Sequence, residues 1–137
     1  MASLSAFLNP EKPEQREVYI SDRFKEDGKV VPFIIRPITQ EENKALLRQY
    51  TREVKTAEGL RRKLDSDRYS DAFVVAGTVE PDFRLKELCE AYGTADPLQV
   101  PGRMLLSGEY LKLSEAIMEL SGIGEKADEE ELEEAKN

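Results

Sequence analysis

The chain has 137 residues and a net charge of −8 at neutral pH, with no histidine and a single cysteine. This length accommodates one domain with tails, and the acidic balance excludes the basic surface that attracts nucleic acids and anionic membranes. Lack of histidine removes the commonest general base and metal ligand, and one cysteine builds no metal cluster, so we expect no enzyme, cofactor or metal site.

Targeting signals and nucleotide-binding motifs are also missing from the sequence. No window holds the roughly 20 apolar residues of a membrane span, and the first apolar run is too short for a signal peptide. Neither a phosphate-binding glycine loop nor a nucleophile-elbow motif occurs. The single Cys89 requires no oxidising compartment and is interpreted as a small buried apolar residue. We expect a cytoplasmic protein.

Residues 1–16 are predicted to form a flexible N-terminal arm that carries one small apolar cluster of Leu4, Phe7 and Leu8. Terminal segments stay poorly ordered unless something docks them. Two interpretations remain open, a disordered end with slight helicity and a docking segment for a neighbouring subunit.

Residues 17–123 are predicted to form a single α+β domain that is mainly α, and residues 17–38 its N-terminal β-hairpin. Alternating and β-branched residues indicate two strands, and Asp27-Gly28 between them tolerates the positive φ angles of a tight turn. Pro32 and Pro37 cannot donate to a ladder, so the second strand is an edge that can pair with another chain or be covered by helices.

Residues 39–123 are predicted to form a compact bundle of about five short helices. Thr39 and Glu42 form a capping box that begins the first helix, which we expect to continue to Val54. The basic residues that follow, in a segment ending at Arg68, are interpreted as a charged connector and a solvated helix face, because acidic residues dilute them.

The next helix is capped by Ser66 or Asp67, carries an apolar face from Tyr69 to Ala76, and is expected to be the most buried. Further helices are expected at about 82–92, 96–106 and 107–121. The last one has an apolar stripe that should face the core, made of Leu106, Tyr110, Leu113, Ile117 and Leu120. Residues 124–137 are predicted to be a disordered acidic tail, since seven acidic residues and two lysines follow Gly124.

Fragments spread along the chain carry a family pattern. They are Arg23-Phe24, Asp27-Gly28, Val31-Pro32-Phe33, Arg36-Pro37-Ile38-Thr39, Glu80-Pro81-Asp82-Phe83, Glu87 to Gly93, Ala95-Asp96-Pro97 and Met104 to Tyr110. In this order and spacing they resemble the XkdN-like tail assembly chaperones of long-tailed phages, prophages and phage-like particles of Gram-positive bacteria. The resemblance runs from about residue 18 to residue 123.

The resemblance implies a chaperone that binds the tape measure protein, a very long and largely helical protein that sets tail length. Such a chaperone keeps the tape measure protein soluble and gives way as tail tube subunits polymerise. It would act in the cytoplasm of the bacterial host, be absent from the mature particle and be capable of self-association into oligomers. A small structural tail completion or connector protein retained in the particle, and an unrelated adaptor of the host, stay open as alternatives.

A finer hypothesis concerns the last three residues. Phages of this kind often extend the chaperone by a programmed −1 frameshift, and the longer form recruits tail tube protein. Ala135-Lys136-Asn137 is compatible with the slippery codons GCA AAA AAC.

The candidate partner surface consists of five apolar residues off the main stripe: Phe7, Leu8, Leu105, Leu111 and Met118. The alternative that these five complete the core or are incidentally exposed stays open.

Overall fold

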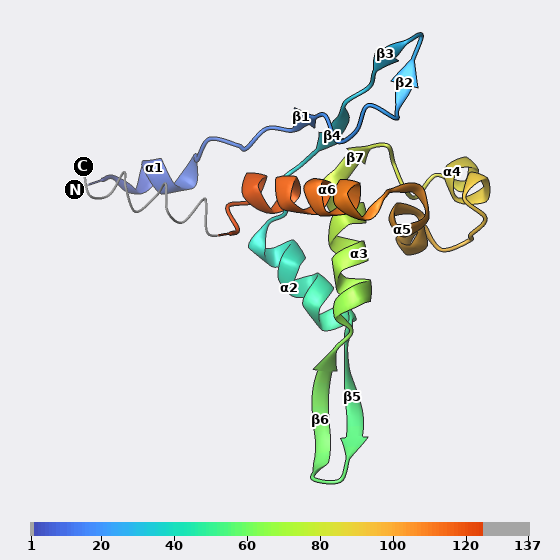
Figure 1. Cartoon of the computed structure of the whole chain (residues 1–137). Coiled ribbons are helices and arrows are strands. Elements are labelled where there is room, and N and C mark those ends of the chain that lie inside the picture. Colours follow the sequence, from blue (N-terminus) through green and yellow to red (C-terminus); the bar gives the residue numbers. More distant parts are fainter. Residues whose placement is uncertain (1, 125–137) are drawn as a thin grey trace.

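The computed structural model describes residues 2–124, in which short strands and helices alternate along the chain (Figure 1). The strands are β1 (Arg16–Val18), β2 (Lys25–Glu26), β3 (Lys29–Val30), β4 (Phe33–Ile35), β5 (Thr51–Thr56), β6 (Gly59–Leu64) and β7 (Thr78–Glu80). The helices are α1 (Leu4–Leu8), α2 (Gln40–Gln49), α3 (Ser66–Gly77), α4 (Lys86–Ala91), the 3₁₀ helix η1 (Pro97–Gln99), α5 (Val100–Met104) and α6 (Ser107–Leu120). None of these helices is long and apolar enough to cross a membrane.

The fold mixes helices with three small antiparallel sheets, so the predicted mainly helical bundle behind a single N-terminal hairpin is wrong. The residues expected to form that hairpin contribute to two sheets. A short β2–β3 ribbon turns at Asp27 and Gly28, whose φ angles are 51° and 79°. β4 instead lies between β1 and β7, a strand from the middle of the chain. Because β7 lies more than 40 residues after β4 in the chain, the residues around β4 give no sign that the two strands pair.

The second correction concerns residues 51–64, which form the β5–β6 hairpin instead of the end of a helix and a charged connector. α2 ends at Gln49, where the Thr51 hydroxyl donates to the Leu47 carbonyl. β5 contains the β-branched residues Thr51, Val54 and Thr56, which favour a strand. Gly59 supplies a φ angle of 114° at the turn. Figure 1 shows this hairpin extending away from the body, beyond the ends of α2 and α3.

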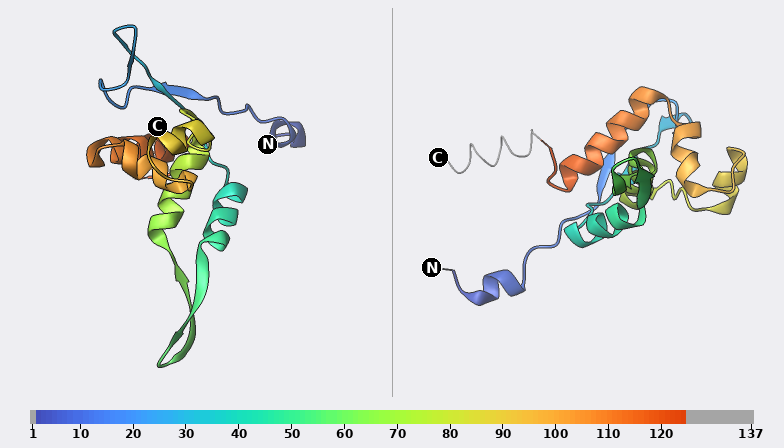
Figure 2. Two further views of the ribbon diagram at one scale, coloured as in Figure 1. Left: turned by 90° about the vertical axis from the view of Figure 1, so that its right-hand side faces the viewer. Right: turned by 90° about the horizontal axis from the view of Figure 1, so that it is seen from below.

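The core lies where α3 crosses α6, beneath the three-stranded sheet (Figures 1 and 2). The prediction that the helix after Ser66 is the most buried is confirmed, since α3 buries Ala72, Phe73, Val74 and Val75. The helix predicted at 107–121 is confirmed as α6. The largest fully buried side chains are Ile35, Val74, Phe83, Val100, Pro101, Leu113 and Ile117. Sheet and helices therefore share one core, to which β5, β6 and α1 contribute no buried residue.

The two helices expected at 82–92 and 96–106 are shorter than predicted. α4 covers only Lys86–Ala91, and the second segment is divided into η1 and α5. The Asp96 side chain caps η1 by accepting from the Leu98 amide at 3.1 Å. Leu105 and Leu106 then run in extended conformation before α6 begins.

Candidate protein-binding surfaces

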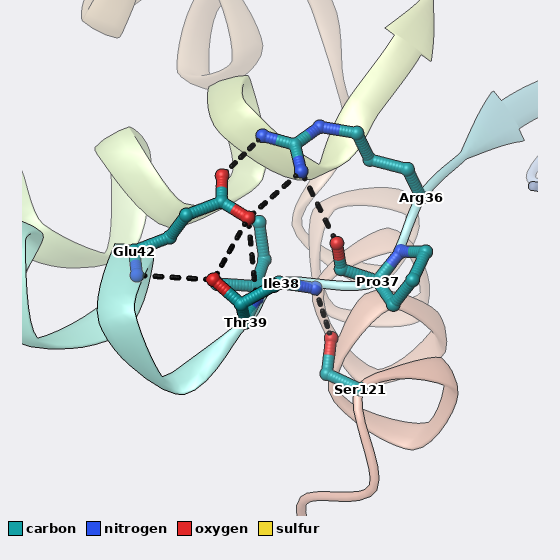
Figure 3. Close-up of polar contacts among 6 residues, drawn as sticks. All are labelled: Arg36, Pro37, Ile38, Thr39, Glu42 and Ser121. Carbon is teal, nitrogen blue, oxygen red and sulfur yellow. Dashed lines mark hydrogen bonds and ion pairs between the residues drawn. The ribbon is translucent and has the colours of Figure 1, made fainter. Parts of the chain in front are cut away.

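A polar junction joins the start of α2 to the end of α6 (Figure 3). Glu42 accepts from both terminal nitrogens of Arg36, at 3.1 and 2.6 Å, and reaches back to the Thr39 amide at 3.2 Å. Thr39 accepts in turn from the Glu42 amide, so the predicted capping box is confirmed. The Ser121 hydroxyl accepts from the Ile38 amide at 2.9 Å and donates to the Ile117 carbonyl. This junction fixes α2 against the body.

A second carboxylate, Glu109, holds the N-terminal region against α6. Its oxygens accept from the Leu106 amide at 2.7 Å and from Nε of Arg23 at 2.9 Å, and they also contact the Arg23 Nη2 atom. Arg23 additionally donates to the Met104 carbonyl at 3.2 Å. Glu109 is buried among these donors.

The electrostatics of both carboxylates point to structural roles. The hydrogen bond from Arg36 lowers the pKa of Glu42 to about 2, and the hydrogen bond from Arg23 lowers the pKa of Glu109 to about 2. A carboxylate with so low a pKa is a weak proton acceptor, whereas a general base is most effective with a pKa near the working pH. Within residues 2–124 no group of three potential metal ligands occurs. Cys89 is buried as predicted, with its thiol donating to the Phe83 carbonyl.

An apolar groove of about 1020 Å³ lies between the base of the β2–β3 ribbon and α4. Its floor is formed by Phe24, Phe33, Val79, Leu88 and Met104. The rings of Phe24 and Phe33 are packed in a tilted arrangement with centroids 5.3 Å apart. On the rim, Leu85 is 56% exposed. The charged groups around the opening are Arg23, Lys25, Glu26, Glu80, Asp82 and Glu87.

The β5–β6 hairpin presents a different kind of surface, because it is almost entirely solvent-exposed. Its residues 51–64 include five basic and two acidic side chains. Arg52 and Lys63 lie directly opposite each other across the two strands, an arrangement that repels unless solvent or a partner screens it. Arg61 pairs with Glu58 near the tip. The expected solvated basic segment is therefore present, but on a hairpin instead of a helix.

α1 forms a third surface at the end of the arm. Leu4, Phe7 and Leu8 are 66 to 73% exposed, and the helix contains no buried residue. The residues that link it to β1 are exposed as well. In Figure 1, α1 lies at one side of the molecule and α4 at the other.

The five predicted partner-binding residues occupy three different environments. Leu105 is 8% exposed and belongs to the core, whereas Leu111 is 56% exposed on α6. Met118 is half-buried and packs against the core. Phe7 and Leu8 lie on α1, at the end of the arm.

The sequence predicts Leu105 on the partner surface and Leu106 in the core, whereas the structure has Leu105 in the core and Leu106 exposed. Leu106 was expected on the core stripe, yet it is 60% exposed. The helical spacing does not extend to it, because α6 begins only at Ser107. Tyr110, Leu113, Ile117 and Leu120 do face the core. The apolar groove was also missed, because its lining comes from segments that only the tertiary fold brings together. The apolar run around Phe33, residues 30–35, was the available signal.

The fold and these surfaces define a small protein whose prominent features suit protein binding. The family model described as "Phage XkdN-like tail assembly chaperone protein" matches residues 4–136. The chain belongs to this family, as its sequence pattern predicted.

Two relatives from Bacillus subtilis (strain 168) support the assignment. The phage-like element PBSX protein XkdN is 41% identical over 128 residues, covering 90% of this chain and 85% of the relative. The uncharacterized protein YqbN is 42% identical over 126 residues, covering 89% of this chain and 83% of the relative. A crystal structure of YqbN superimposes with a TM-score of 0.74 at 37% identity, covering 90% of this chain and 99% of that one.

Proposed function

We propose that this phage tail assembly chaperone binds the tape measure protein and keeps it soluble during tail assembly. The family match over residues 4–136 carries the proposal. A long helical protein exposes apolar side chains until it is enclosed, and a chaperone must offer apolar surface to cover them.

The outer face of α6 is the proposed tape measure surface. Leu111 and Met118 are seven residues apart, so they lie on the same side of the helix two turns apart. Leu111 is largely exposed and Met118 half-buried. Leu105 is excluded from this surface because its side chain fills the core.

Coexpression of the chaperone with its tape measure protein tests the proposal. We expect the soluble fraction of the tape measure protein to rise with the wild-type chaperone and to fall again with Leu111→Asp. Leu60→Asp is the matched control, since Leu60 is an exposed leucine on β6, away from α6. No gain in solubility with the wild-type chaperone, or an equal loss with both variants, would contradict the proposed surface.

The chaperone is further proposed to act in the host cytoplasm and to leave the assembly before the particle is complete. Mass spectrometry of purified particles checks this, because a tail completion or connector protein would be retained in them at stoichiometric amounts. The tape measure and tail tube proteins should be abundant in the same sample and serve as the internal control.

Recruitment of tail tube subunits is proposed to use a frameshift-extended form. Ala135-Lys136-Asn137 lies outside the described residues, so this proposal depends on the gene alone. Sequencing should reveal GCA AAA AAC at these codons, followed by an open −1 frame. Any other codon choice that removes the heptamer, or a closed −1 frame, would refute it.

A further inference from the structure

The α1 arm carries an apolar face with no partner in its own chain. Leu4, Phe7 and Leu8 follow the i, i+3, i+4 spacing that places them on one side of a helix. All three are exposed, and α1 has only five residues. Helices this short are unstable in water unless they pack against something. The arm therefore requires a surface that will bury this face.

The groove beside α4 is the matching surface. Its floor is apolar, and its volume of about 1020 Å³ is comparable with pockets of about 300–1,000 Å³ that enclose drug-sized ligands. That size suits three apolar side chains on one short helix. Residues 2–10 of the arm carry no charge, so docking would bring no charged group onto the apolar floor.

The geometry of β1 directs the arm away from the groove of its own chain. Val18 pairs with Phe33, which lines the groove, whereas Arg16 pairs with Ile35 at the other end of the strand. The arm leaves the sheet from the Arg16 end, so it starts on the far side from the groove. Figure 1 and the right-hand view of Figure 2 show α1 and α4 at opposite sides of the body.

The link between α1 and β1 favours an extended path. It contains Pro10 and Pro13, and proline disfavours a helical conformation in the residue before it. Reaching its own groove would require this link to reverse over the sheet. A groove on a neighbouring molecule requires no such reversal.

We propose that α1 of one copy docks in the groove beside α4 of a second copy. The contact joins two different surfaces, so it is heterologous, and every assembly retains one free arm and one free groove at its ends unless it closes into a ring. Arm docking does not depend on tape measure binding, which is assigned to the outer face of α6.

Complementation between two defective variants tests this arrangement. The arm variant Phe7→Asp/Leu8→Asp loses the docking helix, and the groove variant Leu85→Asp/Ala91→Asp loses the acceptor. All four side chains are exposed, so both variants should fold. For the wild type we expect the weight-average mass in sedimentation equilibrium to rise with concentration above the 15.6 kDa of one chain.

Each variant alone should remain at the mass of one chain, whereas their equimolar mixture should form a dimer and nothing larger. The mixture joins the intact arm of the groove variant to the intact groove of the arm variant, leaving no functional surface at either end. Leu111→Asp is the control and should associate like the wild type. A wild type that is monomeric at every concentration, a mixture that does not dimerise, or an arm variant that still associates would overturn the proposal.

Disulfide trapping identifies the contact directly. One chain carries Phe7→Cys and the other Leu85→Cys, with Cys89→Ala in both. We expect mild oxidation to link the two different chains preferentially. Predominant links between two Phe7→Cys chains would instead show arm-to-arm packing and would also overturn the proposal. Failure of either experiment leaves the tape measure test unaffected, because coexpression solubility is a separate measurement.

Discussion

The α3–α6 crossing and the β5–β6 hairpin differ in what holds them in place. At the crossing, Val74, Leu113 and Ile117 are fully buried, and Gly77 lets the two helices approach closely. In the hairpin, every residue of β6 is exposed, and the strands are held by their own ladder. Burial stabilises the first region, whereas an isolated two-stranded hairpin is only marginally stable in water.

The difference separates the residues that maintain the fold from those available to partners. The hairpin is anchored at its base, where the Asp65 amide donates to the Tyr50 carbonyl at 2.8 Å. Substitutions in the core should therefore affect stability strongly, and substitutions in the hairpin should leave the body folded.

Ile117 and Gly77 should show the largest effects. We expect Ile117→Ala to lower the free energy of unfolding by about 2–5 kcal/mol, because it leaves a cavity in a fully buried site. Gly77→Ala should cost about 1–3 kcal/mol through overpacking, since an added Cβ would lie 2.5 Å from Cγ2 of Ile117. Urea unfolding monitored by circular dichroism measures both values.

The double variant Gly77→Ala/Ile117→Ala sharpens this prediction. Removing the Ile117 side chain makes room for the new Cβ, so the double variant should lose less stability than the sum of the single variants. Strict additivity would show that the two residues do not constrain each other.

The two ion-paired carboxylates should give an intermediate, pH-dependent effect. Their pKa values of about 2 lie below the ordinary value of 4.5, so the folded state favours the ionised form. The contribution of the two ionised carboxylates to the free energy of unfolding is fully present above about pH 4.5 and is lost as the pH falls towards 2. We expect stability to decline in this window, and Glu42→Gln or Glu109→Gln to make the decline shallower.

Glu41→Gln is the matched control for the acid titration. Glu41 lies beside Glu42 in the first turn of α2 and is exposed. The Glu41→Gln substitution removes one negative charge, as Glu42→Gln does. It should retain the pH dependence of the wild type. If Glu41→Gln flattens the profile as much as Glu42→Gln does, general charge repulsion rather than the Arg36 contact causes acid unfolding.

Changes in the β5–β6 hairpin should have the smallest effect on the free energy of unfolding. Because Tyr50 and Asp65 already meet at its base, residues 51–64 can be replaced by a short glycine turn. We expect the remaining body to unfold cooperatively with little loss of stability, and Arg62→Glu in the full chain to change it by no more than about 0.5 kcal/mol. Differential scanning calorimetry would contradict this if the shortened chain lost as much stability as Ile117→Ala.

Prediction from sequence succeeded where neighbouring residues carry the signal. Thr39 and Glu42 are three residues apart, and their capping box forms as expected. It failed at residues 51–64, where the charged residues suited both a solvated helix and an exposed hairpin, and no buried residue distinguished the two. For the partner surface, the helical repeat placed Leu111 off the core stripe of its helix, but it could not place Leu105 and Leu106, which precede the helix.

The sequence by itself determined the family, the Asp27-Gly28 turn, the capped start of α2, and the apolar faces of α3 and α6. These features depend on local backbone preferences or on spacing within one helix. The tertiary structure alone decided that β7 completes the sheet of β1 and β4, that Leu105 rather than Leu106 enters the core, and that an apolar groove forms beside α4. The physical reason is that strand pairing and burial depend on contacts between residues far apart in the chain, which no local pattern encodes.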